Sequence, residues 1–343
     1  MYSQVLLDRQ AGPLPIRGGQ FYVRTTGKAR LFLSGTAWRS DTGKPCGVSL
    51  SATDSSGRTI VSQLAKIYAN EANTHKTLVS LFSDEFNVSS GTYFFSLTAD
   101  ADTRTDFNDV FSLTLVVYDA HMIETIGAGL QLGTLPRDFV FSDSGEGRAQ
   151  LFVNASAFRA RDAGMIGISV SIDDAPLGMA AIYASRPQSH IALVPALFDI
   201  SLGGKMHRLT LQQLDDSTAT NEDDPFGAWL LRVSDTRQYV ASFQGALPHD
   251  DSLFADRKQM LLIAGGSVMA AAPGWIGMII EIDGEEVARS VRYSNEAGLH
   301  HPLPPIIKPV PVRTNGKHRL AILPLSANVV SDGYDLFRVA LLG

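Results

Sequence analysis

The sequence has very little cysteine and no excess of basic residues, and we do not expect its first residues to be a secretory signal. Cys46 is the only cysteine among 343 residues, which excludes an intramolecular disulfide and a cysteine-based metal cluster. The net charge of −6 lacks the basic footprint of a nucleic-acid-binding protein. The first ten residues, MYSQVLLDRQ, are too polar for a signal peptide. We therefore expect a protein that folds in a reducing compartment, is not secreted and does not bind nucleic acid.

A membrane span is also not expected, although one uncharged run suggests it. Residues 260–280 carry no charge, and ~20 apolar residues are enough to cross a bilayer. Pro273 and several glycines would break a helix there. We expect two strands joined by a loop, and no membrane partner.

Known catalytic signatures are missing as well. The sequence has no G-x-S-x-G elbow, no H-E-x-x-H helix, no Walker A loop and no G-x-G-x-x-G after a strand. The acidic pairs Asp173-Asp174 and Asp215-Asp216 lie in predicted turns, where solvated carboxylates are expected rather than glycosidase acids. We expect no enzyme activity, no catalytic residue and no cofactor.

What the sequence does contain is one pattern that occurs three times. The stretch YANEANTH at 68–75 reappears as YASRPQSH at 183–190 and as YSNEAGLH at 293–300. A Leu-Pro pair precedes each stretch and a [ST]-[DN]-x-x-D-x-F motif follows it. The pairs begin at Leu14, Leu135 and Leu247, and the motifs end at Phe111, Phe226 and Phe337. A period of about 110 to 120 residues can hold its own core, so we expect three tandem domains rather than a solenoid.

Each repeat has the pattern of a β-sandwich. After Gly47, Gly167 and Gly277 the chain alternates with a period of two, which is typical of a strand with one buried face. No long segment has a helical period, and roughly eight strands of ~5 to 6 residues fill one repeat. We predict an all-β protein of three tandem antiparallel β-sandwich domains of jelly-roll type.

The landmarks also set the domain boundaries. We predict an N-terminal arm at 1–10 and sandwiches at 11–121, 122–241 and 242–343. Residues 126–133 are expected to be a short connector. The repeats alone leave a rod and a ring open, and we favour a compact ring around a pseudo-threefold axis.

The repeated histidines His75, His190 and His300 occupy one equivalent position per repeat. A single histidine without a neighbouring carboxylate or thiol at ligand spacing is more often a hydrogen-bonded structural residue than a ligand. The alternative is that the three meet at the pseudo-threefold axis and bind a metal ion. We expect the structural role.

The repeated acidic motif offers oxygen ligands of the kind that Ca²⁺ prefers. Its paired residues are Asp106 and Asp109, Asn221 and Asp224, and Asp332 and Asp335. Such side chains also accept backbone N–H bonds and fix the turn before a strand. We expect turns, with a weak calcium site at Asn221, Glu222, Asp223 and Asp224 as the alternative.

Two tryptophans are candidates for contacts with other molecules. Trp38 aligns with Phe158 and Val268, so we expect it in the core rather than on a glycan-binding tip. Trp275 ends the apolar loop 270–275, where the other repeats carry charges. We expect another repeat or another chain to cover this tip.

Three features together resemble a known family. They are the Tyr-Ala-x5-His stretch, the Gly-Lys-x-His-Arg-Leu segment at 204–209 with its close counterpart at 316–320, and the Thr-Asp-x-x-Asp-x-Phe motif. In these features the chain resembles small jelly-roll modules of tailed-bacteriophage virion proteins, which occur in head decoration or cement proteins and in tail fibres and spikes. The resemblance spans all three repeats, although repeat 1 has GTYFF at 91–95 in place of the His-Arg-Leu strand.

The resemblance implies a structural, non-enzymatic protein of a virion that is assembled in the host cytoplasm. The first expectation is a capsid decoration or cement protein that binds assembled head subunits, with the N-terminal arm along the shell. The alternative is a tail fibre, spike or receptor-binding component that recognises a host surface glycan. Expected partners are other virion proteins, either major capsid or tail subunits, and further copies of the chain.

Overall fold

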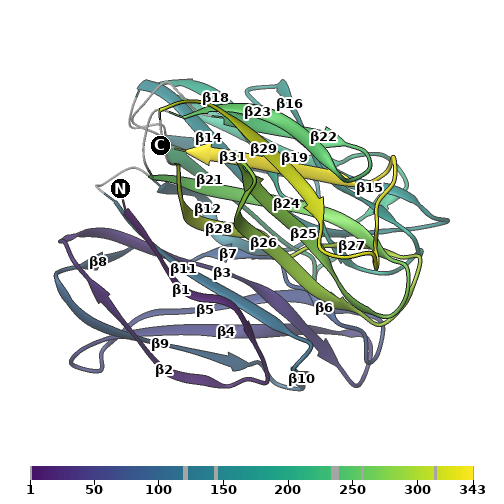
Figure 1. Cartoon of the computed structure of the whole chain (residues 1–343), viewed down its shortest axis with the longest axis horizontal. Coiled ribbons are helices and arrows are strands. Elements are labelled where there is room, and N and C mark those ends of the chain that lie inside the picture. Colours follow the sequence, from purple (N-terminus) through teal and green to yellow (C-terminus); the bar gives the residue numbers. More distant parts are fainter. Residues whose placement is uncertain are drawn as a thin grey trace.

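The structure is a computed structural model that describes residues 2–118, 123–142, 146–232, 239–255, 259–312 and 315–342. Within these ranges the regular elements are all strands, arranged in six antiparallel sheets, two for each repeat (Figure 1). The prediction of three tandem β-sandwiches is confirmed. We call the repeats modules 1, 2 and 3.

Module 1 contains the first eleven strands. They are β1 (Tyr2–Ala11), β2 (Ile16–Val23), β3 (Gly27–Arg39), β4 (Lys44–Asp54), β5 (Thr59–Ala69), β6 (Lys76–Thr77), β7 (Leu81–Phe82), β8 (Phe86–Val88), β9 (Gly91–Ala99), β10 (Thr103–Arg104) and β11 (Val110–Tyr118). The first sheet has the order β1-β11-β3, and β6, β7, β8 and β10 also pair with β3. The second sheet has the order β2-β9-β4-β5.

Modules 2 and 3 repeat this arrangement. Module 2 has β12 (Ile123–Leu132), β13 (Arg137–Ser142), β14 (Glu146–Arg159), β15 (Gly164–Ile172), β16 (Ala175–Ala184), β17 (Ile191–Ala192), β18 (Ala196–Gly203), β19 (Met206–Gln213), β20 (Thr218–Ala219) and β21 (Pro225–Arg232). Module 3 has β22 (Tyr239–Gln244), β23 (His249–Ala255), β24 (Gln259–Ala270), β25 (Gly274–Ile282), β26 (Glu285–Ser294), β27 (His300–Pro302), β28 (Ile306–Pro311), β29 (Gly316–Pro324), β30 (Val329–Val330) and β31 (Leu336–Leu342). Their first sheets are β12-β21-β14 and β22-β31-β24, and their second sheets are β13-β19-β15-β16 and β23-β29-β25-β26.

The strand pairs nest as in a long hairpin that has been rolled up. In module 1, β1 pairs with β11, β2 with β9, β3 with β7 and β8, and β4 with β5. Modules 2 and 3 have the same nested pairs. Rolling such a ribbon produces the two sheets of a jelly roll.

Each sandwich has its own apolar core. In β4, for example, Val48, Leu50 and Ala52 are buried while the residues between them are half-buried. This is the period of two that the sequence predicts. A separate cluster of buried residues fills each module.

The first residues do not form the predicted arm. Tyr2–Ala11 is β1, the edge strand of the first sheet, and it pairs with β11. Leu6 and Leu7 pack against the module 1 core, so the segment gains apolar burial that an extended arm would forgo.

The predicted connectors are also strands. Ile126 to Leu132 belongs to β12, which pairs with β21, so only Gly133 of the predicted connector lies outside a strand. Residues 239–241, assigned to repeat 2 from the sequence, belong to β22 of module 3. Modules 1 and 2 are thus joined from the end of β11 at Tyr118 to the start of β12 at Ile123, and modules 2 and 3 from the end of β21 at Arg232 to the start of β22 at Tyr239.

The uncharged run 260–280 forms most of β24, a short loop and most of β25, as the sequence predicts. Among the described residues, no helix has the length and apolar character of a membrane span.

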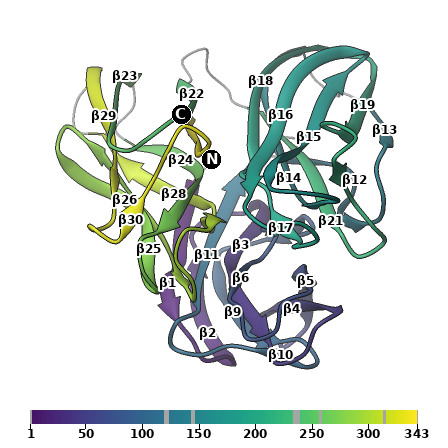
Figure 2. The ribbon, with the colours of Figure 1, turned by 90° about the vertical axis from the view of Figure 1, so that its right-hand side faces the viewer.

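The three modules meet around a common axis (Figure 2). A fourth apolar cluster at this centre takes residues from the first sheet of every module, including the equivalent Phe32, Phe152 and Ile263. The rings of Phe32, Phe82, Phe152 and Trp229 contact one another there. The chain is therefore a ring, with the first sheets facing the axis and the second sheets facing outward.

Candidate functional site

The repeated tyrosines and histidines lie at the junctions between modules. Each tyrosine ring contacts the histidine ring of the next module, and the tyrosine of module 3 contacts the histidine of module 1. The pairs, with the distances between ring centroids, are Tyr68–His190 (4.6 Å), Tyr183–His300 (4.8 Å) and Tyr293–His75 (5.7 Å). The recurring stretch is thus the contact that closes the ring.

A hydrogen bond accompanies each ring contact. The backbone N–H of each histidine donates to a side chain two residues after the tyrosine. These bonds are His190 N to Asn70 Oδ1 (3.4 Å), His300 N to Ser185 Oγ (3.0 Å) and His75 N to Asn295 Oδ1 (3.1 Å). The contacts all run head to tail, and three such contacts close a ring when each turns the chain by a third of a circle.

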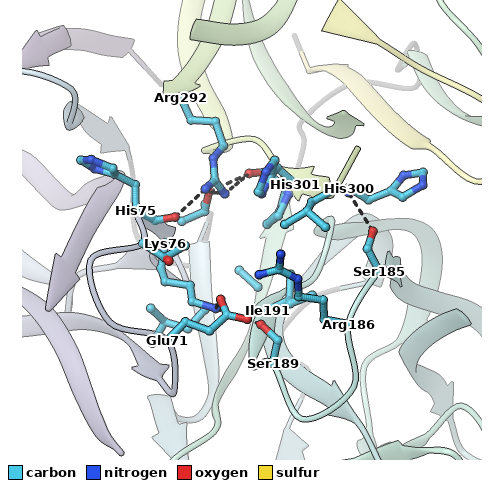
Figure 3. Close-up of a pocket in the computed structure, with 16 residues that line it drawn as sticks. Glu71, His75, Lys76, Ser185, Arg186, Ser189, Ile191, Arg292, His300 and His301 are labelled. Atoms are coloured by element: carbon cyan, nitrogen blue, oxygen red, sulfur yellow. Dashed lines mark hydrogen bonds and ion pairs between the residues drawn. The ribbon is translucent and has the colours of Figure 1, made fainter. Parts of the chain in front are cut away.

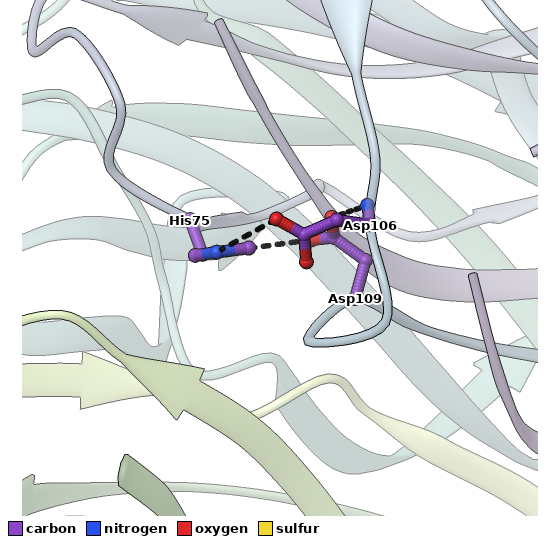
Figure 4. A group of neighbouring side chains, drawn as sticks. All are labelled: His75, Asp106 and Asp109. Atoms are coloured by element: carbon purple, nitrogen blue, oxygen red, sulfur yellow. Dashed lines mark hydrogen bonds and ion pairs between the residues drawn. The ribbon is translucent and has the colours of Figure 1, made fainter. Parts of the chain in front are cut away.

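Inside each module the histidine is fixed by a buried carboxylate. The Nδ1 atoms lie 2.8 Å from Asp109 Oδ1, 2.8 Å from Asp224 Oδ1 and 3.1 Å from Asp335 Oδ1 (Figure 4 shows module 1). The same oxygens accept hydrogen bonds from the hydroxyls of Thr36, Ser156 and Ser267. The sequence predicts the structural role of the histidines but not the carboxylate, because 34 or 35 residues separate the partners.

Hydroxyl, carboxylate and imidazole are together in every module, but in an order that differs from a nucleophilic triad. In such a triad the imidazole lies between the hydroxyl and the carboxylate and takes the hydroxyl proton. Here the carboxylate of Asp109 lies in the middle, and Thr36 Oγ1 donates to it at 2.9 Å. The arrangement holds the histidine ring in place and leaves the hydroxyl unactivated.

The acidic motif forms a capped turn. In module 2, Asp224 Oδ2 accepts the backbone N–H of Asn221, and Asn221 Oδ1 accepts that of Asp223. Asp224 Oδ1 lies 2.8 Å from His190 Nδ1, so both carboxylate oxygens of Asp224 and the amide oxygen of Asn221 have hydrogen-bond partners. The predicted turn is confirmed, and the alternative calcium site at Asn221, Glu222, Asp223 and Asp224 stays a prediction.

Modules 1 and 3 each group a histidine with two aspartates, whereas module 2 has Asn221 in place of the first aspartate. Ligand atoms of His75, Asp106 and Asp109 lie within 4.8 Å of one another, as do those of the equivalent group in module 3. His75 Nε2 is 3.8 Å from Asp106 Oδ2. Asp109 already accepts hydrogen bonds from its neighbours. Among the described residues of this group, that leaves His75 Nε2 and the Asp106 carboxylate as ligands, fewer than the three protein ligands of a catalytic zinc site.

The second repeated histidine motif clamps a hairpin. His207 Nδ1 lies 2.7 Å from Asp173 Oδ2, and the N–H of Arg208 donates to Asp173 Oδ1. These contacts hold the pKa of Asp173 below its ordinary value. His318 and Asp283 repeat the arrangement in module 3. The Gly-Lys-x-His-Arg-Leu segments are therefore structural, and the pair Asp173-Asp174 lies in a turn as predicted.

The two tryptophans lie at the junction between modules 3 and 1. Trp38 is half-buried and its ring faces His75 at 6.2 Å, so it covers the junction rather than filling a core. Trp275 contacts Tyr293 and is 37% exposed. The loop residues 271–273 are exposed, so no described part of another module covers this tip, and cover by another chain stays a prediction.

A small cavity lined by residues of all three modules, several of them ionisable, lies where the modules meet (Figure 3). Its volume is about 40 Å³, which is room for a few water molecules at ~10–15 Å³ each. Lys76 of module 1 enters it and donates to Glu71 Oε2 (2.8 Å), Ser189 Oγ (3.0 Å) and the carbonyl of His190 (3.3 Å). Burial disfavours the charge on Glu71, but Lys76 outweighs it and holds the pKa of Glu71 below its ordinary value.

Arg292 brings a second cation into the cavity wall and is 2% exposed. Its guanidinium donates to the carbonyl of His75 (2.5 Å), the hydroxyl of Thr77 (3.1 Å) and the carbonyl of Pro302 (3.4 Å). Burial lowers the pKa of Arg292 to about 10. Arg292 thus connects module 3 to module 1 through the His75 carbonyl and the Thr77 hydroxyl.

His301 is the neutral member of this group. The hydroxyl of Ser294 donates to the carbonyl of Glu296, so His301 Nε2 must carry the proton that bridges its 2.7 Å contact with Ser294 Oγ. Burial, together with the charges of Arg292 and Lys76, holds the pKa of His301 well below its ordinary value. Hydrogen bonds from the residues around the cavity therefore join the three modules to one another.

Comparisons with known proteins add little. No family model matches the chain, and no curated protein matches it. Solved structures that align include one from the Sulfolobus turreted icosahedral virus, at 10% identity over 99% of this chain and 89% of that chain, with a TM-score of 0.21. Dimeric latent PorU from Porphyromonas gingivalis aligns at 9% identity over 92% of this chain and 33% of that chain, with a TM-score of 0.24. The insecticidal delta-endotoxin Cry8Ea1 from Bacillus thuringiensis aligns at 10% identity over 95% and 53%, with a TM-score of 0.19. Superpositions at such TM-scores carry no argument about this chain.

Proposed function

We propose that the chain is a structural, non-enzymatic component of a virion, a capsid decoration protein that binds the junctions of assembled head subunits. The observation that carries the proposal is the closed ring of three jelly rolls on one chain. Such a ring presents three similar outward surfaces at fixed angles, which matches a place where three shell subunits meet. The motif resemblance to modules of tailed-bacteriophage virion proteins supports the same assignment.

The outward surfaces carry apolar contact points. Tyr22 and Phe254, 53% and 48% exposed, occupy equivalent positions on β2 and β23. Module 2 exposes Val140 and Met206 on β13 and β19 instead. Because the ring holds the modules together, a weak contact of each module with the shell adds to a strong overall hold.

The proposal is tested by adding the purified chain to emptied heads and imaging the product by electron microscopy. Density over the junctions between head subunits is expected. The double variant Tyr22→Ser with Phe254→Ser should bind more weakly, whereas Phe107→Ser, on the exposed turn of module 1, should bind as the unchanged chain does. The proposal fails if the chain does not bind heads under any ionic condition.

The second candidate function is recognition of a host surface glycan by a tail component. It is favoured by aromatic rings exposed near the repeated motifs, at Phe107 (75% exposed), Tyr334 (51%) and Trp275 (37%). Immunogold labelling of the native particle separates the two functions. Label over the head supports decoration, and label confined to the tail supports glycan recognition.

A further inference from the structure

The three junctions of the ring differ in how well they are filled. Between modules 2 and 3 an open groove of about 510 Å³ runs along β22 and is lined by Met179, Phe198, Phe243 and Arg338. The equivalent space between modules 3 and 1 is about 10 Å³. The two spaces are built from corresponding strands, so the difference lies in individual residues.

At the junction between modules 1 and 2, a β-bulge occupies the space that corresponds to this groove. The register of β12 against β21 shifts between Ile126 and Gln131. The extra residues include Leu130, which packs against the core of module 1. An apolar side chain carried on a bulge thus closes the groove.

At the junction between modules 3 and 1 a second bulge does the same with charged residues. The register of β1 shifts between Leu7 and Gln10, where Asp8 pairs with Lys308 at 3.2 Å. The backbone N–H of Arg9 donates to Ser112 Oγ at 3.2 Å. Lys308 and Arg9 together hold the pKa of Asp8 below its ordinary value against the opposing effect of burial.

Strand β22 has no bulge. Its register against β31 is continuous from Tyr239 to Gln244. Gln10, Gln131 and Phe243 pair with the three equivalent phenylalanines, so the position of Arg9 and Leu130 is taken in module 3 by Ser242. Ser242 is short and exposed, and it leaves the groove open.

The groove also contains a cation, Arg338, for which the described residues supply no carboxylate partner. Arg338 stands at the position of Ser112, and its Nη2 donates to the carbonyl of Met179 across the junction at 3.0 Å. Its Nε is buried and has no hydrogen-bond partner among the described residues. The nearby Asp199 is paired with Arg148. A half-buried cation of this kind is stabilised by an added carboxylate.

We propose that the groove between modules 2 and 3 binds an extended segment of a partner protein that presents a carboxylate to Arg338 and an apolar side chain to Phe198 and Phe243. The partner segment would supply a carboxylate, as Asp8 does between modules 3 and 1, and an apolar side chain, as Leu130 does between modules 1 and 2. β22 is the edge strand of its sheet, so its outer backbone groups are available to pair with an added strand. The inference concerns a groove of the chain itself and does not depend on head decoration.

The experiment uses as a probe the segment of β1 whose bulge occupies the equivalent space between modules 3 and 1. A labelled, end-blocked peptide of residues 5–12, VLLDRQAG, is titrated into the intact chain and followed by fluorescence anisotropy. Saturable binding is expected. An Asp8→Asn peptide, or the Arg338→Gln chain with the original peptide, should bind about tenfold more weakly, as the loss of a charge-assisted hydrogen bond implies.

Ser242→Leu supplies the missing filler and should abolish binding while the chain stays folded, because residue 242 is exposed. Ser252→Leu, at an exposed position on β23, is the matched control and should bind the peptide normally. Absence of saturable binding to the unchanged chain, or equal binding by Ser242→Leu, would overturn the inference. A chain that binds the peptide but not emptied heads would leave the groove intact and refute only the decoration proposal.

Discussion

The apolar centre of the ring and its axial cavity both hold the three modules together, but they do so with different kinds of contact. At the centre, all three modules contribute apolar residues, often from equivalent positions such as Phe32, Phe152 and Ile263. At the cavity the position after the repeated histidine is Lys76, Ile191 and His301, which differ completely. Apolar burial is non-directional, so the centre tolerates similar residues on every side. Charges in a confined cavity need specific partners, so there the modules have become different.

The largest effect is expected at the centre. Phe152→Ala removes a ring that contacts Phe32, Phe82 and Trp229. It should lower the free energy of unfolding by ~3–5 kcal/mol, as truncation of a buried phenylalanine does. Urea unfolding followed by circular dichroism measures this loss. Val140→Ala, at a 64% exposed position, should change stability little, and equal losses for the two variants would contradict a core at the axis.

Replacing the buried carboxylates tests whether the three modules are energetically equivalent. Asp109→Asn, Asp224→Asn and Asp335→Asn each place an amide where two or more donors converge. Each variant should lower the free energy of unfolding by ~1–3 kcal/mol, the penalty for leaving a buried donor unsatisfied. The three losses should be similar. Thermal unfolding of the three variants checks this. A loss confined to one module would show that only one of the histidine pairs supports the ring.

Sequence patterns predicted the parts of this molecule that depend on local spacing. The alternation in β4 and the recurrence of YANEANTH were enough for the sandwich fold and the three modules, because burial on one face of a strand fixes a period of two. The capped turn around Asp224 followed from local hydrogen bonding of Asp and Asn side chains.

Contacts between distant residues could not be predicted in the same way. The bond from His75 to Asp109 and the ring contact between Tyr68 and His190 join residues that no local period relates. The prediction of an N-terminal arm was wrong for a related reason. The sequence of Tyr2–Ala11 contains enough polar residues for an exposed arm. Its position in the fold, however, is set by the edge of β11, with which it pairs and which exists only in the folded sheet.

A smaller effect is expected at the ring contacts. Tyr68→Leu keeps an apolar side chain but removes the ring that contacts His190. It should cost ~1 kcal/mol, the typical contribution of an aromatic pair beyond its burial. The change in urea midpoint measures it. Tyr22→Leu on the outer surface is the control, and an equal shift for both variants would argue against a special role of the junction tyrosine.

The smallest effect is a pH dependence at the cavity. The pKa of Glu71 is lower in the folded chain than its ordinary value of 4.5, so the folded state binds fewer protons there than the unfolded state. The contribution of Glu71 to the free energy of unfolding is present in full above pH 4.5. It is lost as the pH falls through the lowered pKa of Glu71 in the folded chain. Because Glu71 is partly exposed, the contribution should be ~1 kcal/mol or less.

Glu71→Gln should therefore flatten the acid side of the stability profile between pH 5 and 3, while Ser252→Leu, which removes no ionisable group from its exposed position, should leave the shape of the profile unchanged. Thermal midpoints of the three chains across this range provide the measurement. If Glu71→Gln left the profile unchanged, the ion pair with Lys76 would be dispensable. The cavity would then resemble the centre, with packing rather than charge holding the modules in place.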